Sequence, residues 1–224
     1  MSVRDNLIQV KERIAAACQR CGRRPEEITL IAVTKVFPAA ALMEAYEAGL
    51  RDFAENYVQE FEAKYDEVRH LAGARFHLIG HLQSNKSRKA AEIFHAVQTV
   101  DSAKLARRLD EAGRPLEAMI EVKLSQEDAK YGCAPEALPE VVAAIRACPN
   151  LRLTGLMTMP PWHADAEVSR PYFRRLRALA TSHSLPSLSM GMSHDFEAAI
   201  EEGATHIRVG TALFGKRVKR TAAP

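Results

Sequence analysis

The sequence predicts an α/β protein built as a single (β/α)8 TIM barrel that follows an N-terminal helix. Eight short apolar segments rich in β-branched residues alternate with segments of helical periodicity, and this alternation is typical of parallel βαβ units. The 224 residues show no shift in composition and no linker, and one α/β barrel commonly has about this length. A doubly wound open sheet has the same alternation and is the alternative fold.

The N-terminal helix is predicted over residues 3–20, where Leu7, Val10 and Ile14 have helical spacing, and it ends at Gly22. The predicted strands cover residues 28–35, 51–54, 75–80, 96–100, 117–124, 151–157, 188–192 and 206–209. The predicted helices between them cover residues 39–49, 58–71, 86–94, 104–112, 135–147, 165–184 and 195–202. Residues 1–224 are expected to form one domain, with a flexible basic tail at 216–224.

A lysine ends the first predicted strand. Residues 28–34 are apolar or β-branched, and Lys35 follows them directly. Lysine is among the residues least often buried, and apolar surroundings lower the pKa of an amine, which can then act as a nucleophile that forms a Schiff base. The alternative is a lysine whose stem packs while its ammonium reaches water. The strand alone does not decide between them.

Charge and hydropathy exclude several classes of protein. The chain has 31 basic and 28 acidic residues, a net charge of +3, so no global field calls for a nucleic-acid partner. The N-terminus carries charges where a signal peptide would have an apolar core, and no apolar run approaches the roughly 20 residues that span a bilayer. We expect a cytoplasmic protein that does not bind a membrane.

The cysteine pattern predicts neither a disulfide framework nor a metal site. Cys18 and Cys21 form a C-x-x-C at the end of the first predicted helix, while Cys133 and Cys148 are isolated. A zinc site would need a second such pair. Free cysteine behaves as a small hydrophobic residue, so we expect four free thiols in a reducing compartment.

Chemistry-bearing residues follow the predicted strands, where the functional face of a barrel lies. They are Lys35, residues 55–57, His77 and His81, Lys123, residues 157–160, residues 191–193 and residues 208–211. Ser193 is placed to cap a helix, and Gly210 and Thr211 can bring backbone N–H groups and a hydroxyl close to an anion. A phosphate site after strands seven and eight recurs in these barrels. The alternative is that Ser193 only caps a helix and Gly210 only forms a turn.

A lysine nucleophile and a phosphate cradle at one barrel mouth would suit pyridoxal phosphate, whose aldehyde needs the first and whose ester needs the second. An ordered set of motifs then carries a family resemblance: AVTK at 32–35, ENYVQE at 55–60, HLIG at 77–80, LQSNK at 82–86, GLM at 155–157, SMGMS at 189–193 and RVGTALFG at 208–215. With these motifs, from about Leu7 to Gly215, the chain resembles the pyridoxal phosphate homeostasis proteins, whose fold is similar to the barrel domain of alanine racemase.

The resemblance implies a role for eight residues and no metal ligand. Lys35 would form a Schiff base with pyridoxal 5'-phosphate. Ser193, Gly210 and Thr211 would hold the phosphate, and Arg208 would approach the pyridine nitrogen. Asn56, His77 and Met192 would line the pocket. No catalytic residue is implied.

Two positions depart from the family pattern, and one lysine competes with Lys35. Ala54 replaces the usual glycine before the ENY motif, and His81 replaces an expected proline; both are expected near the mouth, where they would alter its shape. Lys123 is a rival nucleophile because Schiff-base aldolases also place a lysine at a strand end. It falls outside the motifs, so we interpret it as solvated or ion-paired.

The predicted function is a pyridoxal phosphate-binding protein of vitamin B6 homeostasis without robust catalysis. Arginine stays protonated, so Arg208 would keep the pyridine nitrogen unprotonated and weaken the ring as an electron sink. Racemases of this fold take a tyrosine base from a second domain, and we expect no such domain after the eighth strand. The alternative is a weak pyridoxal phosphate-dependent amino-acid racemase. Apo-enzymes that receive the cofactor are the implied partners, and the resemblance suggests a monomer.

A nucleic-acid-binding protein is the rival from another class. It would use the basic run at 216–220 and would require a steep salt dependence of binding. A basic tail is usually solvated, and we expect no nucleic-acid partner.

Overall fold

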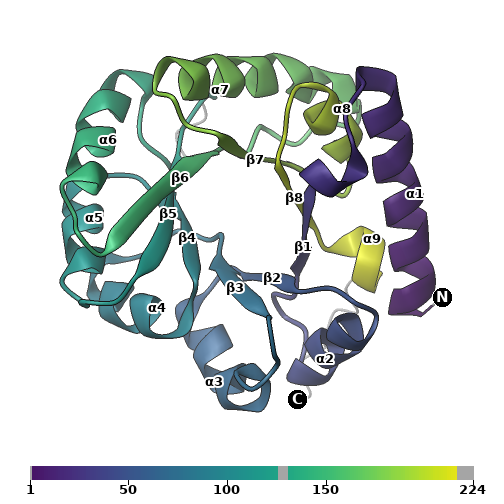
Figure 1. The fold of residues 1–224 in the computed structure, drawn as a ribbon, viewed down its shortest axis with the longest axis horizontal. Coiled ribbons are helices and arrows are strands. Elements are labelled where there is room, and N and C mark those ends of the chain that lie inside the picture. The colour runs from purple at the N-terminus through teal and green to yellow at the C-terminus, as the bar shows by residue number, and fades with distance from the viewer. Residues whose placement is uncertain (1, 126–130, 216–224) are drawn as a thin grey trace, which may run out of the picture.

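The computed structural model, which describes residues 2–125 and 131–215, is a closed barrel of eight parallel strands surrounded by helices (Figure 1). Each strand pairs with the next, and β1 also pairs with β8, with Thr29 opposite His206. The strands are β1 Thr29–Val33, β2 Asp52–Glu55, β3 Arg75–Leu78, β4 Ala96–Val100, β5 Leu116–Glu121, β6 Leu151–Met157, β7 Ser187–Met192 and β8 His206–Val209. The predicted barrel is confirmed, and the open sheet is excluded because β8 closes onto β1.

Helices follow the strands on the outside of the barrel. They are α1 Val3–Cys21, α2 Ala39–Glu47, α3 Val58–Val68, α4 Ser87–Ile93, α5 Ala103–Asp110, α6 Leu138–Arg146, α7 Arg170–Ser182, α8 Phe196–Glu201 and α9 Thr211–Phe214. Short 3₁₀ turns precede α4, α6 and α7 at Ser84–Lys86, Pro135–Ala137 and Ala166–Ser169. The single helix predicted over residues 165–184 was therefore wrong in its first turn, where the Asp165 side chain accepts from the Glu167 N–H and caps the 3₁₀ turn instead.

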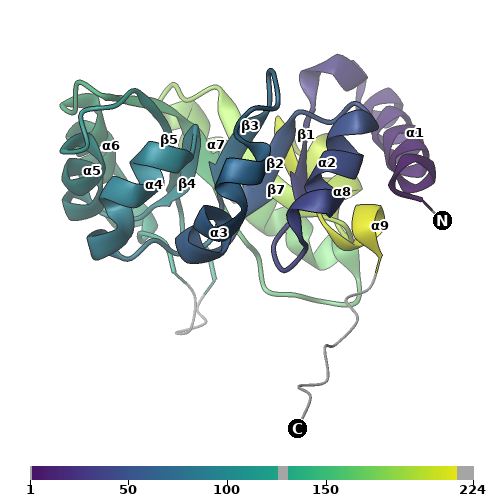
Figure 2. The same ribbon diagram turned by 90° about the horizontal axis from the view of Figure 1, so that it is seen from below.

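The N-terminal helix α1 packs on the outer face of the barrel beside α8 and α9 (Figures 1 and 2). Ser2 and Asp5 form a capping box at its start, and Gly22 adopts the left-handed conformation at its end, with φ 70°. These caps satisfy backbone groups that a helix leaves unpaired. Leu7, Val10 and Ile14 are buried in the layer between helices and strands, as their spacing predicts.

The inside of the barrel is part apolar and part polar. Ile31, Val33, Ala54 and Ile79 form a small apolar cluster separate from the main core. Other buried side chains include Gln98, Ser189 and Arg208, each no more than 2% exposed. Buried polar groups require hydrogen-bond partners, and those of the barrel interior bond to one another.

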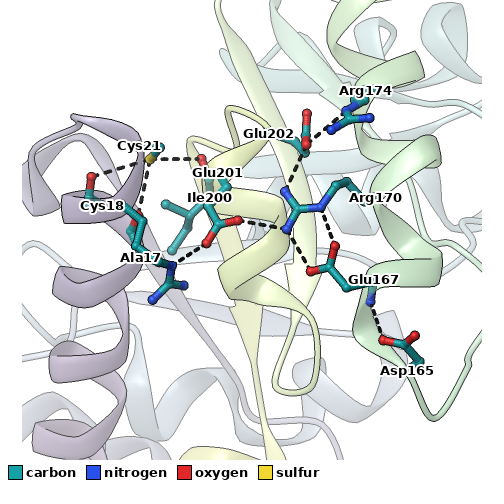
Figure 3. Close-up of polar contacts among 11 residues, drawn as sticks. Ala17, Cys18, Cys21, Asp165, Glu167, Arg170, Arg174, Ile200, Glu201 and Glu202 are labelled. Carbon is teal, nitrogen blue, oxygen red and sulfur yellow. Dashed lines mark hydrogen bonds and ion pairs between the residues drawn. The ribbon is translucent and has the colours of Figure 1, made fainter.

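An ion-pair network joins three of the outer helices (Figure 3). Arg170 of α7 lies 2.8 Å from Glu201 and 2.9 Å from Glu202, at the end of α8. Arg20 of α1 reaches Glu201 at 2.7 Å, and Arg174 reaches Glu202 at 3.0 Å. Several charges held in one network are worth more than isolated surface pairs.

The structure bears on the cysteines and on membrane-spanning helices. All four cysteines are free thiols; three are buried and Cys21 is half-buried. Within the described residues no helix is long and apolar enough to cross a membrane. The predicted basic tail at 216–224 lies outside the described residues.

Candidate functional site

A cavity of about 270 Å³ opens at the carboxyl ends of the strands. Its lining comes from the segments that follow β1, β2, β3, β6, β7 and β8, together with the ends of some strands. The lining residues are Val33, Lys35, Phe37, Asn56, Ile79, Met159, Trp162, Met192, Ser193, His194, Arg208, Gly210, Thr211 and Gly215. Seven of the eight residues predicted for the site line this one cavity; His77 does not.

Lys35 lies on a turn just beyond β1, which ends at Val33 rather than at the predicted residue 35. The next residue, Val36, has φ 63°, a left-handed conformation that is costly for a β-branched residue. Its N–H donates to a carboxylate oxygen of Glu60 on α3. The turn is therefore held from the neighbouring helix, and Lys35 is half-buried at the cavity wall.

A second lysine, Lys64, binds the backbone of the same turn. Lys64 of α3 donates to the carbonyl oxygens of Thr34 at 3.1 Å and Phe37 at 2.9 Å. It also forms a buried ion pair with Glu55 at 2.7 Å. An ammonium has three N–H donors, and these three partners account for them. Lys64 thus holds the backbone on both sides of Lys35, and its ammonium is occupied by these three partners.

Burial raises the pKa of Glu55 above its ordinary value, while the nearby Lys64 ammonium and the Thr34 hydroxyl oppose the rise. Glu55 is 1% exposed, and its Oε2 has no hydrogen-bond partner within the described structure. Removing Lys64 would leave this carboxylate buried without its counter-charge. Such groups are strongly destabilising, so the pair makes the Lys35 turn dependent on α3.

Ser193 lies opposite, where β7 and β8 end. Its Oγ accepts hydrogen bonds from the N–H groups of Gly210 and Ala212, each at 3.3 Å. A hydroxyl oxygen has two lone pairs and one hydrogen, so this Ser193 hydroxyl retains its O–H as a donor. Thr211 adds a second hydroxyl to the same wall. The wall offers hydrogen-bond donors, the chemistry that suits a phosphate.

Arg208 of β8 brings a buried cation to the cavity. Its Nη1 donates to Ser189 Oγ at 2.7 Å and its Nη2 to the Thr158 carbonyl at 3.0 Å, both neutral acceptors. Burial lowers the pKa of Arg208 to about 10, which still leaves the guanidinium charged at neutral pH. The site therefore presents a fixed positive charge beneath the cavity.

Asn56 lines the cavity, and its backbone closely contacts Gly80. A Cβ on Gly80 would lie 2.0 Å from the Asn56 carbonyl oxygen, so only glycine permits this approach. The Asn56 side-chain Oδ1 is buried and has no partner within the described residues. An orphaned buried acceptor on a cavity wall is a group that a donor on a ligand would satisfy.

His77, predicted to line the pocket, is not among the residues around this cavity, and its side chain reaches toward the amino end of the barrel. Its Nε2 lies 2.9 Å from Asp52 Oδ1, at the first residue of β2, and its Nδ1 lies 3.2 Å from Gln98 Nε2. His77 is 3% exposed, and the hollow it adjoins includes Thr29 and His206, which begin their strands.

Neither of the two residues that depart from the family pattern, Ala54 and His81, lines the cavity. Ala54 is fully buried in the apolar cluster with Val33 and Ile79, which do line it. His81 stacks on Tyr131, with ring centroids 3.8 Å apart, and is not among the lining residues. Lys123, the rival nucleophile, is half-buried beyond β5 and lies outside the lining as well.

Sequence reasoning missed the residues that support the site from outside it. Lys64 lies within a predicted helix and was not predicted to support the site, although a spacing of four residues from Glu60 is typical of a helical ion pair. Trp162 and Phe37 also line the cavity. Trp162 is the single tryptophan of the chain, and it follows β6, where a barrel carries its functional loops.

Among the described residues no group of three or more His, Cys, Asp or Glu side chains is arranged to hold a metal ion. The donors that line the cavity include an amine, hydroxyls and a guanidinium. These groups suit an anionic organic ligand with a carbonyl carbon that an amine can attack.

Comparisons with known proteins agree with this geometry. The family described as "Alanine racemase, N-terminal domain" matches residues 6–218. The pyridoxal phosphate homeostasis protein of Pseudomonas aeruginosa is 48% identical over 222 residues, 96% of each chain. That of Escherichia coli K12 is 44% identical over 226 residues, with 95% of each chain covered.

Solved structures give the same result. PipY of Synechococcus elongatus PCC7942 with PLP bound matches with a TM-score of 0.79 and 41% identity, covering 92% of this chain and all of PipY. Alanine racemase of Clostridium difficile shares the fold alone, with a TM-score of 0.72, 14% identity and 58% of that chain covered. From these matches over nearly its whole length, the chain belongs to the pyridoxal phosphate homeostasis protein family.

Proposed function

We propose that this chain binds pyridoxal 5'-phosphate in the cavity, holds it covalently through Lys35 and serves in intracellular vitamin B6 homeostasis. The observation that carries the proposal is the meeting of an amine and two hydroxyls on the walls of one cavity, from Lys35, Ser193 and Thr211. The relative PipY has a structure with PLP bound. The identity to it and to the homeostasis proteins supports the same ligand here.

The residues present fit this cofactor. The Ser193 O–H, which remains a donor because its oxygen already accepts two N–H groups, would bond to the phosphate together with Thr211. Gly210 lies beside them without a side chain. The orphaned Asn56 Oδ1 would accept from a donor on the ligand, and Met192 would contact the ring. Lys35 would supply the attacking amine.

Arg208 would limit the chemistry of the bound cofactor. Pyridoxal phosphate supplies an aldehyde for covalent attachment and a pyridine ring that stabilises a carbanion. A guanidinium beside the ring nitrogen disfavours a proton on that nitrogen. The unprotonated pyridine ring would withdraw electrons less strongly. This placement would disfavour aminotransferase-type chemistry and supports a carrier that holds the cofactor without robust turnover.

The test is covalent trapping on a single lysine. Purified protein is incubated with pyridoxal phosphate, reduced with borohydride and analysed by peptide mass spectrometry. We expect the label on Lys35 in the wild type, its loss in Lys35→Ala and its retention in Lys123→Ala. Lys123 is a matched control because it also lies beyond a strand end but does not line the cavity. Labelling that persists in Lys35→Ala would overturn the proposal.

A weak racemase activity is the second candidate, favoured by the barrel shared with alanine racemase. Two-sided proton transfer needs an acid or base on each face of the substrate. Within residues 2–125 and 131–215, the ionisable residues that line the cavity are Lys35, His194 and Arg208, and no tyrosine lines it. Exchange of the α-proton of amino acids for deuterium, dependent on Lys35, would support this activity; we expect none above background.

We also propose that apo-enzymes receive the cofactor and that the protein acts as a monomer. Loaded protein is mixed with an apo-enzyme directly or across a dialysis membrane. Faster activation on direct contact supports transfer between proteins, and equal rates oppose it. Light scattering of the loaded protein gives the oligomeric state.

A further inference from the structure

A continuous line of hydrogen bonds crosses the barrel interior from the cavity to the opposite end. Arg208 Nη1 donates to Ser189 Oγ at 2.7 Å, and Ser189 Oγ donates to Gln98 Oε1 at 2.6 Å. Gln98 Nε2 lies 3.2 Å from His77 Nδ1. His77 Nε2 lies 2.9 Å from Asp52 Oδ1. The five residues come from β8, β7, β4, β3 and β2.

The line is buried along its length, from Arg208 at the cavity to Asp52 at the far end. Ser189 and Gln98 are fully buried, and Arg208 and His77 are 2% and 3% exposed. Asp52 is the member nearest solvent, with its side chain 22% exposed. In such surroundings an unsatisfied polar group is costly, so a change at one member affects its neighbours.

The hydrogen bonds run in one direction when Gln98 Oε1 faces Ser189 and Gln98 Nε2 faces His77, as they do here. Arginine is a donor without acceptor capacity, so Ser189 accepts from it. Gln98 Oε1 can only accept, so Ser189 turns its own hydrogen toward that oxygen. The Gln98 amide nitrogen, which can only donate, then faces His77 Nδ1. That nitrogen accepts from the amide, which leaves the hydrogen on Nε2 to be donated to Asp52.

Asp52 is a suitable terminal acceptor because it stays ionised. Burial acts to raise the pKa of Asp52, but the hydrogen bond from His77 and the charge of Arg75 outweigh it, and the pKa lies below its ordinary value. Arg75 Nε is 3.9 Å from Asp52 Oδ1. Two further histidines, His95 and His206, lie near this end of the barrel. Burial lowers the pKa of both, that of His206 to about 4, so both are neutral at neutral pH.

We infer that Ser189, Gln98 and His77 are positioning residues that orient the Arg208 guanidinium in the cofactor site through a directional hydrogen-bond line ending on Asp52. The inference rests on the proposed function, because it concerns how Arg208 meets the pyridine ring. It assigns a role to His77 although that residue does not line the cavity. A substitution at the amino end of the barrel would therefore alter the orientation of Arg208 at the carboxyl end.

The first test reads the direction of the line without any cofactor. ¹H–¹⁵N NMR of the His77 ring in the whole protein should show hydrogen on Nε2 and none on Nδ1 at neutral pH. In Gln98→Glu, the new carboxylate would accept from both Ser189 and His77, so both ring nitrogens should carry hydrogen. Hydrogen on Nδ1 alone in the wild type would overturn the inference, even if Gln98→Glu fails to fold.

The second test reads the effect on the cofactor. Ser189→Ala removes the link between Arg208 and Gln98, and we expect about tenfold weaker binding of pyridoxal phosphate and a displaced absorption band of the bound cofactor. Ser87→Ala is the matched control, since Ser87 is also buried and loses a 2.8 Å hydrogen bond, to Ser84 on the outside of the barrel. It should leave both quantities unchanged.

The outcomes separate the two proposals. Folded Ser189→Ala with the affinity and absorption band of the wild type would overturn the positioning role. Wild-type protein that binds no pyridoxal phosphate would overturn the proposed function instead, while the NMR result would still decide the direction of the line. Equal losses in Ser189→Ala and Ser87→Ala would show a general packing effect and would also overturn the inference.

Discussion

Ser193 shows how one side chain can serve both the fold and a ligand. By accepting from the N–H groups of Gly210 and Ala212, it joins the ends of β7 and β8. The same two bonds use both lone pairs of the oxygen, so its hydrogen is available to an acceptor. The sequence predicted that Ser193 caps the helix that follows it, but Asp195 is the N-cap residue of α8, and the partners of Ser193 lie at the start of α9.

Replacing Ser193 with alanine should weaken binding of the phosphate more than binding of the ring. We expect Ser193→Ala to bind pyridoxal phosphate about tenfold more weakly, the usual cost of a lost hydrogen bond to a charged group. Pyridoxal, which lacks the phosphate, should bind the variant and the wild type equally. Absorption titrations with the two ligands measure this difference. An equal loss for both would show that Ser193 only shapes the loop.

Val36 is the residue whose conformation could not be read from the sequence. A valine is an unfavourable choice for φ 63°, and its neighbours in the chain do not require that angle. The conformation persists because Glu60 accepts its N–H and Lys64 holds the carbonyls on either side. Those partners lie on α3, some 25 residues away in sequence.

At the scale of elements, the loop after β1 depends on α3 for its shape. The buried Lys64–Glu55 pair at 2.7 Å joins the helix that follows β2 to the end of that strand and to the Lys35 turn. A strand end and a helix start are predictable from periodicity. Their mutual support is not, because it rests on side chains that meet only in the folded barrel.

Lys64→Met should destabilise the protein and slow attachment of the cofactor at Lys35. Removing the ammonium leaves Glu55 buried without its counter-charge, so we expect a loss of about 3 kcal/mol in the free energy of unfolding. The double variant Lys64→Met/Glu55→Gln should recover part of this loss. Urea unfolding measures stability, and borohydride trapping over time measures attachment.

Lys89→Met is the control for Lys64→Met. Lys89 also pairs with two carboxylates, Glu62 at 3.1 Å and Glu92 at 3.3 Å, but its side chain is 42% exposed. Surface pairs contribute little, so its loss should change stability and attachment only slightly. Equal effects of the two substitutions would contradict the role of the buried pair.

For the whole molecule, carboxylates held by arginines set the response to acid. Burial alone would raise the pKa values of Glu201 and Glu202, but hydrogen bonds from Arg170, Arg20 and Arg174 outweigh it, and both lie below the ordinary 4.5. A carboxylate whose pKa is lowered on folding stabilises the folded state above its unfolded-state pKa. That stability is lost as the pH falls through the folded-state value.

We therefore expect the free energy of unfolding to decrease as the pH falls below 4.5. Arg170→Gln should unfold more readily at neutral pH and lose less of its stability on acidification, since the pKa values of Glu201 and Glu202 would return toward normal. Glu55 has a raised pKa, so its protonation at low pH favours the folded state over the unfolded state. Denaturant titrations at several pH values measure these slopes, and parallel curves would contradict the role of Arg170.

The sequence by itself predicted the α/β class, the order of the elements and a barrel, with an open sheet as the alternative, and it named seven residues that line one cavity in the structure. It could do so because periodicity sets helices and strands, and because the carboxyl ends of parallel strands converge in a barrel. Lys35 and Arg208 were identified on that basis, together with the resemblance of the motifs.

Only the tertiary structure decided where His77 points and what holds Lys35. The alternation of a strand tells which side a residue faces, but not which end of the barrel its side chain reaches or which partner it meets there. Asp52, Gln98 and Ser189 come from other strands, and Lys64 comes from a helix. Hydrogen bonds between such distant residues follow from the closure of the barrel, which local sequence patterns do not encode.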